Sequence, residues 1–287
     1  MQVFANGLIQ GFLYALMGVS FALVYNTTRT FHVALGGIYA LAPYLLWSCL
    51  SYNFPLALLI TFFICGAVGL LCEEILHWPF LRKSAPPEIH LIGSLGMFLV
   101  IIQLIAIIWG NDFQVLREGM DTVYVFINIR LSSAQLIGGI VSFFTLILFF
   151  SWFKYSSLGI QFRAMADNPI LLSLLGKNIR KLRRLVFIIS AIMASVVAIA
   201  FAYDIGFDPN VGLRMVLIGM IATIVGGRGS FIGAAVAGII LGVIRSQVVW
   251  YSSARWEEAA TFLILALILL LRPQGLLGQK LRMEEKV

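Results

Sequence analysis

The sequence predicts an all-α polytopic membrane protein with about eight or nine helices that cross the membrane fully or in part. Of its 287 residues, 61% are hydrophobic and only 11% are charged, whereas soluble domains carry about 25% charged residues. A chain of this composition cannot present a solvated surface on every side. Its apolar runs are long and unbroken, as spanning helices of about 20 residues require, and they lack the alternation of a β-barrel.

Nine apolar segments are candidate spans. They cover residues 4–25, 33–52, 54–76, 89–109, 134–153, 185–203, 214–226, 231–250 and 259–271. The seventh and the ninth contain only 13 residues each, so either could be tilted, partial or broken. Eight full crossings with one half-crossing and nine full crossings fit the pattern equally well. The whole of 1–287 is expected to form one transmembrane domain.

The basic residues predict the orientation. With the N-terminus outside, 15 of the 20 lysines and arginines fall on the cytoplasmic side, which follows the positive-inside rule. The count places Arg117 on the outer side, and Arg228, Lys280, Arg282 and Lys286 on the cytoplasmic side. The net charge of +7 is therefore a topology signal and does not point to nucleic acid. The C-terminus and the segment 155–182 are expected in the cytoplasm.

The segment 155–182 is the only long polar interruption in the second half of the chain, and it contains a short helix signal. Asn168 can cap a helix, Pro169 suits the first helical position, and Gly176 suits the left-handed position that follows the last turn. A partner protein can push on a short amphipathic helix placed on the charged side of a membrane protein. We therefore predict a cytoplasmic coupling loop over 155–182.

Small residues and broken helices mark a candidate substrate path. Glycines in the first and eighth spans would let neighbouring helices approach closely, and the helical pattern breaks at 26–28 and at 226–229. Transporters place substrate sites at such breaks, although an ordinary turn explains the first break equally well. The candidate path residues are Tyr14, Asn26, Thr27, His32, Gly36, Gly226, Gly227 and Ser230. By itself, His32 is favoured as a satisfied interfacial side chain over a ligand or a proton carrier.

Acidic residues lie near the ends of the predicted spans. Glu73 and Glu74 are expected to reach the cytoplasmic interface and to meet Arg82 or Lys83, and an intramembrane functional pair is the alternative. Near the opposite surface, Arg245 is expected either to snorkel outwards or to pair with an acid at 257–258. The absence of paired carboxylates at mid-membrane argues against a proton-driven or sodium-driven carrier.

The external segment 110–133 contains a β-prone stretch, TVYVFINIRL, that is expected to form a small strand or hairpin. A lid or connector is favoured for it over a contact with an external partner. No catalytic triad, zinc spacing or phosphate-binding loop occurs in a credible context. We therefore expect no enzyme activity, no bound metal and no cofactor. Energy for transport must come from another subunit, unless the protein is a passive channel.

Four stretches spread over almost the whole chain resemble one family, the LivH-like permease subunits of ATP-binding cassette (ABC) importers for branched-chain amino acids. They are GLIQGFLYALMGVSFALVYNTT, GIQFRAMADNPILLSLLGKN, VGGRGSFIGAAVAGIILG and RPQGLLG. The second is similar to the loop by which importer permeases dock onto their ATPase. Two positions depart from the family: relatives usually carry a polar Asn and His after the first span, where this chain has His32 and Leu35.

The resemblance implies a multi-pass permease of the bacterial cytoplasmic membrane. Its partners would be a second permease in a heterodimer, two cytoplasmic ATPases that bind ATP and Mg²⁺, and an extracytoplasmic substrate-binding protein. The implied ATPase-coupling residues are Gly159, Arg163, Ala164, Asp167, Asn168, Pro169, Leu175 and Gly176. A self-sufficient channel or facilitator for urea or an amide is the alternative function.

Overall fold

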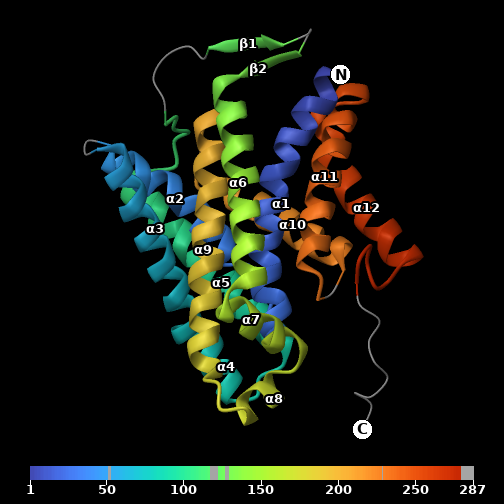
Figure 1. Ribbon diagram of the computed structural model, residues 1–287. Helices are drawn as coiled ribbons and strands as arrows, with labels where there is room; N and C mark the ends of the chain where they lie inside the picture. The colour runs from blue at the N-terminus through green and yellow to red at the C-terminus, as the bar shows by residue number, and fades with distance from the viewer. Residues whose placement is uncertain (51–52, 117–121, 127–128, 228, 279–287) are drawn as a thin grey trace.

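A computed structural model describes residues 1–50, 53–116, 122–126, 129–227 and 229–278. The long helices form a bundle in which α1, α6 and α9 run nearly parallel, with a β-hairpin and the N-terminus at one end and α4, α7 and α8 at the other (Figure 1). We call these the hairpin end and the α8 end. Five basic residues used in the charge count, Arg117, Arg228, Lys280, Arg282 and Lys286, lie outside the described residues.

The described elements follow the predicted order of apolar segments. The helices are α1 (Gln2–Thr28), α2 (Leu35–Cys49), α3 (Phe54–Leu71), the π-helical η1 (Cys72–His77), α4 (Trp78–Arg82), α5 (Pro87–Trp109), α6 (Ser133–Tyr155), α7 (Ser157–Asp167), α8 (Pro169–Leu174), α9 (Ile179–Asp204), α10 (Val211–Gly226), α11 (Phe231–Tyr251), the 3₁₀ turn η2 (Ala254–Trp256) and α12 (Glu257–Leu271). The strands β1 (Val123–Phe126) and β2 (Ile129–Ser132) pair antiparallel, which confirms the expected hairpin.

Six helices among the described residues are long and apolar enough to cross a membrane, and the protein is an all-α membrane protein apart from the hairpin. α10 spans 16 residues, in line with the short seventh segment. α2 spans only 15 residues, so the prediction of a full span over 33–52 was too long. A helix of this length rises roughly 22 Å, less than the hydrocarbon thickness of about 30 Å.

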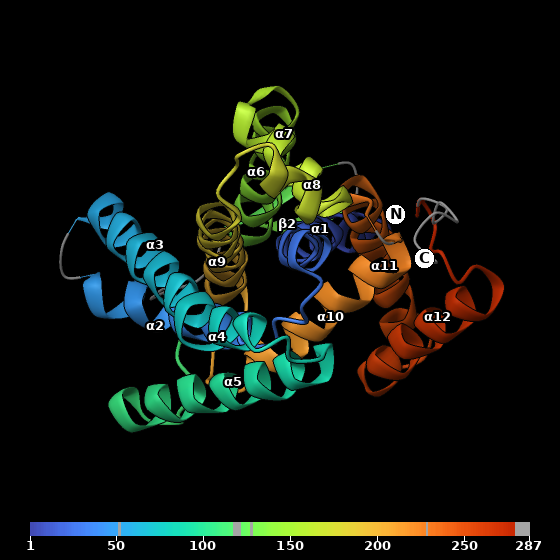
Figure 2. The same ribbon diagram turned by 90° about the horizontal axis from the view of Figure 1, so that it is seen from below.

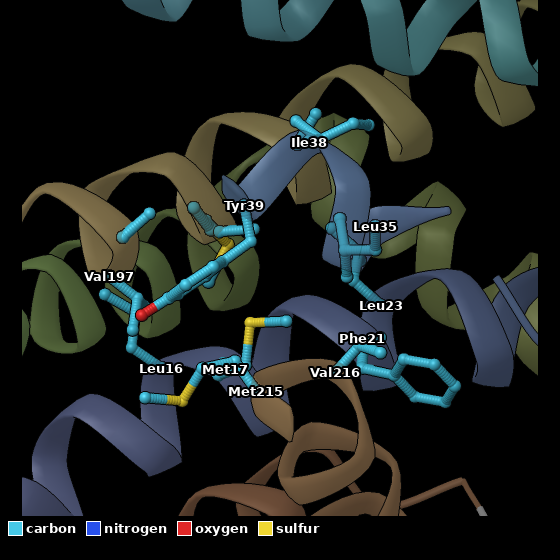
Figure 3. Close-up of a cluster of buried hydrophobic side chains, with 14 of the residues drawn as sticks. Leu16, Met17, Phe21, Leu23, Leu35, Ile38, Tyr39, Val197, Met215 and Val216 are labelled. Carbon is cyan, nitrogen blue, oxygen red and sulfur yellow. The ribbon is translucent and has the colours of Figure 1, made fainter. Parts of the chain in front are cut away.

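α1 forms the centre of the bundle. Seen along the helices, it is surrounded by α6, α9, α10 and α11 (Figure 2). Its middle turns are almost fully buried and pack against α2, α9 and α10 (Figure 3). The outer helices show the opposite pattern: on α5 and α12, for example, Ile107 and Leu270 are 73% and 81% exposed. Such apolar outer faces are stable in contact with lipid and would not be stable in water.

Glycines bring α1 and α11 into backbone contact, and the close helix approach that these glycines predicted is confirmed. A Cβ atom added to Gly7 would lie 2.9 Å from Val243 Cα, and one added to Gly11 would lie 2.9 Å from Ile239 O. From the other side, a Cβ atom on Gly242 would lie 2.7 Å from Gly7 O. Real Cβ contacts are longer than this, so only glycine allows the two helices to pack at this distance.

The prediction for the paired carboxylates was wrong about their partners. Glu73 is fully buried and forms an ion pair with Arg183 of α9. Glu74 pairs with Arg180 at 2.5 Å and with Arg184. The expected Arg82 and Lys83 follow the carboxylates closely in sequence, but η1 and α4 continue as helix and carry them away, whereas the first turns of α9 pack against η1. The pairs therefore join α3–η1 to the start of α9.

Candidate functional site

The segment 155–182 folds into more helix than its sequence predicted. α6 continues to Tyr155, α7 follows after one residue, and α9 begins at Ile179 rather than at 185. α8 itself matches the prediction. The Asn168 side chain accepts a hydrogen bond from Leu171 N at 3.0 Å, Pro169 is the first helical residue, and Gly176 has φ +77° after the last turn.

α7 is attached firmly to the bundle. Ser156 caps it by accepting from Gly159 N at 3.0 Å, and Gly159 packs so closely on the carbonyl of Phe153 that any side chain there would clash. Phe162 is fully buried. Arg29, at the end of α1, donates to Ala166 O at 3.1 Å. α7 is therefore anchored to α1 and α6, whereas α8 has few contacts of this kind.

α8 presents an apolar surface away from the bundle. Leu172 faces inward and is buried, but the neighbouring apolar side chains are exposed. These exposed residues are Ile170, Leu171, Leu174 and Leu175, at 71%, 55%, 78% and 70%. An apolar patch on a short capped helix beside basic residues is typical of a protein interface. We call these four residues the α8 patch.

The other predicted coupling residues support the two helices. Arg163 donates to Lys154 O at 3.3 Å and lies over the Phe153 ring. Ala164 accepts, through its carbonyl, the hydrogen bond from Asn168 N that closes α7. Asp167 is exposed at the junction of α7 and α8. The structure thus gathers all eight predicted coupling residues at the α8 end.

A cavity of about 550 Å³ opens at the hairpin end. Its walls come from α1, α2, α9, α10 and α11, and from the connectors before α10 and α12. Tyr14 and Arg245 lie in the same wall, with the guanidinium 5.4 Å from the ring centroid. Arg245 is 2% exposed and pairs with Glu257 at 2.8 Å, which confirms one of its two expected outcomes.

Of the eight predicted path residues, only Tyr14 lines this cavity. Four of the others hold helices and turns together. Asn26 accepts from Gly229 N at 3.1 Å, and Thr27 donates to Leu23 O within its own helix. Ser230 caps α11 by accepting from Gly233 N at 2.9 Å, and a Cβ atom on Gly36 would lie 2.6 Å from Gly212 O.

The glycine turn between α10 and α11 receives the C-terminal RPQGLLG motif. Leu276 N donates to Val225 O at 2.8 Å, and Leu277 N donates to Gly226 O at 3.0 Å. Gly227 has φ +104° and contacts the backbone of 274–278 so closely that a side chain would not fit. The VGGRGSFIGAAVAGIILG and RPQGLLG motifs therefore pack against each other, although they are separate in the sequence.

His32 is 1% exposed and is not the interfacial side chain that was expected. Its Nδ1 lies 3.1 Å from His77 Nε2, and His77 Nδ1 lies 3.1 Å from His90 Nδ1. All three histidines of the chain thus form one buried row. His77 shares different ring nitrogens with its two neighbours, so the three rings form a chain and do not converge on one point. Within the described residues, no group of side chains is arranged to hold a metal ion.

Comparison with known proteins decides which family has this fold and these motifs. The profile of the family described as "Branched-chain amino acid transport system / permease component" matches residues 3–271. The chain belongs to this permease family. As a member it is the transport subunit of an ABC system, and ATP hydrolysis is not its own activity. A self-sufficient channel is not favoured.

Individual relatives agree with the family. The chain is 25% identical to the high-affinity branched-chain amino acid permease protein LivH of Salmonella typhimurium, over 97% of this chain and 96% of the relative. The same figures hold for BraD of Pseudomonas aeruginosa. The autoinducer 2 import permease LsrC of Photorhabdus luminescens is 26% identical over 84% of this chain and 73% of its own length.

The fold also resembles a solved structure, PsaBC from Streptococcus pneumoniae in complex with Fab. The TM-score is 0.54, and the match covers 96% of this chain and 93% of the other at 12% identity. At this identity the likeness concerns the fold alone.

Proposed function

We propose that the chain is the permease of a bacterial importer for branched-chain or related small, hydrophobic amino acids, driven by ATP that separate subunits hydrolyse. The family and the names of LivH and BraD support the substrate class. The exposed α8 patch is the observation that carries the mechanism, because it offers a docking surface to an energy-supplying partner.

The orientation is part of the proposal. The positive-inside distribution of lysine and arginine supports a cytoplasmic α8 end and an external hairpin end in the inner membrane. The α8 patch would then meet two cytoplasmic ATPases that bind ATP and Mg²⁺, and the hairpin-end cavity would meet the extracytoplasmic binding protein. A second permease would complete the path through the membrane as the partner in a heterodimer.

Movement of α8 relative to α7 would couple ATP hydrolysis in the partner subunits to the membrane helices. Gly176 allows the sharp exit from α8 because φ +77° is a conformation that glycine adopts freely and β-branched residues avoid. A Cβ atom there would meet nothing within 4 Å, so a substitution acts through the backbone alone. Gly176 is therefore a site where the coupling geometry can be changed without disturbing the core.

The test is ATP-dependent uptake of L-leucine and L-alanine by the permease–ATPase complex in proteoliposomes with the binding protein. We expect Gly176→Val to retain ATP hydrolysis and to lose roughly five- to thirtyfold in uptake, from roughly 1–2 kcal/mol of backbone strain spread over the α8 exit. Gly176→Asn should retain uptake, because asparagine tolerates the left-handed region.

Gly96→Val is the matched control. Gly96 lies on the exposed face of α5, and a Cβ atom there also meets nothing within 4 Å, but its φ is not left-handed. Uptake should be close to that of the wild type. If Gly176→Val transports as well as Gly96→Val, the coupling role is wrong. If the wild-type complex takes up no amino acid, the proposed substrate class is wrong.

A further inference from the structure

The hairpin-end cavity combines charged and apolar walls in a way that the family membership does not explain. The Tyr14 ring, which contacts the Arg245 guanidinium, stacks on Phe201 with ring centroids 5.9 Å apart. The charged residues Arg214, Arg245 and Glu257 share the lining with apolar side chains of α9 and α10. Those apolar residues are Ala198, Phe201, Ala202, Met215 and Ile218. A volume of about 550 Å³ falls in the range of about 300–1,000 Å³ that is typical of small-molecule sites.

Arg245 is held in place independently of its carboxylate partner. Its Nη1 donates to Thr261 Oγ1 at 2.8 Å, and its guanidinium lies 5.4 Å from the Tyr14 ring centroid. Both contacts remain if Glu257 moves. The guanidinium would then keep its position with free donors directed to a new acceptor, and a carboxylate is the acceptor that fits it best.

Glu257 is placed so that it can move. It is the first residue of α12, follows the short turn η2, and its side chain is 20% exposed, compared with 3% for Arg245. The helix N-terminus stabilises its negative charge in this position. A small rotation of its side chain would open the ion pair towards the cavity without removing either charge from the site.

Charge balance selects the ligand. Arg214 also lines the cavity, but its side chain is 62% exposed and pairs with Glu258 at 2.8 Å. Arg245 and Glu257 are together neutral, so an anion or a cation bound alone would leave one buried charge without a partner, which costs several kcal/mol. A zwitterion brings one charge of each sign and pairs with both residues. A free α-amino acid has this property, and its side chain would point to the apolar wall.

We propose that the hairpin-end cavity binds the transported amino acid as a zwitterion, with its carboxylate on Arg245, its ammonium group on Glu257 and its side chain against Ala198 and Phe201. This inference rests on the proposed function for the class of substrate. It adds a binding site within this one subunit, formed by α1, α9, α10, α11 and the start of α12.

The experiment measures the melting temperature of the whole permease–ATPase complex without the soluble binding protein, so that only membrane sites respond. The probes are L-leucine, L-alanine, 4-methylpentanoate and 3-methylbutylamine. The last two keep the leucine side chain but lack the ammonium and the carboxylate group respectively. The amino acids should raise the melting temperature, and the two analogues should not.

Two variants locate the site. The neutral double variant Arg245→Gln/Glu257→Gln should need roughly ten to a hundred times more L-leucine for the same shift, because two charge-assisted hydrogen bonds become neutral ones of about half the strength. Ala198→Val narrows the apolar wall and should favour L-alanine over L-leucine, an effect that a purely structural residue would not produce. If the double variant does not fold, the preference of Ala198→Val between L-leucine and L-alanine tests the site.

Equal protection by 4-methylpentanoate and L-leucine would overturn the zwitterion site, as would an unchanged response of the double variant or an unchanged leucine-to-alanine ratio in Ala198→Val. Uptake in proteoliposomes distinguishes a wrong binding site from a wrong proposed function. Amino-acid uptake without protection overturns the cavity alone, whereas a complex that takes up no amino acid overturns the proposed function.

Discussion

Gly242→Ala should weaken the contact between α1 and α11 that holds the centre of the bundle. Its new methyl group would lie 2.7 Å from Gly7 O and still closer to the backbone of Gly11. Ordinary contacts of this kind begin near 3.4 Å. The obstacle is helix backbone and not the flexible end of a side chain, so the helices must separate by about 1 Å, which forfeits a quarter to a half of each neighbouring contact.

The magnitude follows from two opposing effects. Overpacking against a rigid neighbour costs about 3 kcal/mol, the upper part of its usual range, and the helix propensity of alanine returns about 1 kcal/mol. The net loss is about 2 kcal/mol. Gly96→Ala is the control, because a Cβ atom at that helical position meets nothing within 4 Å. Gly96→Ala keeps the gain in helix propensity and introduces no clash, so its free energy of unfolding should exceed that of Gly242→Ala by about 3 kcal/mol.

The assay is thermal unfolding in detergent with a thiol-reactive dye. Cys65 and Cys72 are buried and Cys49 is partly buried, so their reaction with the dye reports loss of packing. Gly242→Ala should melt several degrees below the wild type, and Gly96→Ala should melt at or above it. If Gly242→Ala were as stable as Gly96→Ala, the close approach of α1 and α11 would not limit the stability of this bundle.

Two further predictions concern the α8 end. Glu73→Gln should lower the free energy of unfolding by about 3–5 kcal/mol in the same melting assay, because it leaves the Arg183 guanidinium buried opposite a neutral amide. Glu74→Gln is the control: its ion pair is partly exposed, so the loss should be much smaller. Leu174→Asp places a charge in the α8 patch, where the side chain is 78% exposed. It should leave the melting temperature unchanged but reduce co-purification of the ATPase subunits. Full recovery of those subunits would exclude the patch as their docking surface.

Features that depend on neighbouring residues in the sequence were predicted well. The cap at Asn168, the turn at Gly176 and the hairpin all arise from local backbone preferences. Close helix approach at the glycines of the first and eighth spans was also predicted, because repeated glycines admit a neighbouring backbone. The sequence did not indicate that these two helices are each other's partners. The membrane class followed from composition alone.

Features that depend on the fold were not predicted. The partner of Glu73 is 110 residues away in the sequence, and the row of three histidines joins three separate elements. α2 was predicted too long because apolar residues continue beyond its helical ends. Among the path candidates only Tyr14 lines the hairpin-end cavity, and the role of the eight residues in a substrate path stays a prediction.

α9 is the element that can connect the two ends in the proposed transport cycle. It begins three residues after Gly176, and its last turns supply Ala198 and Phe201 to the cavity. The distance from its first turn to Phe201 is roughly 30 Å along one uninterrupted helix. α1 also reaches both ends, but its close glycine contacts tie it to the backbone of α11. A displacement of α8 would therefore be transmitted by α9, and the buried pair between Arg183 and Glu73 would carry α3 with it.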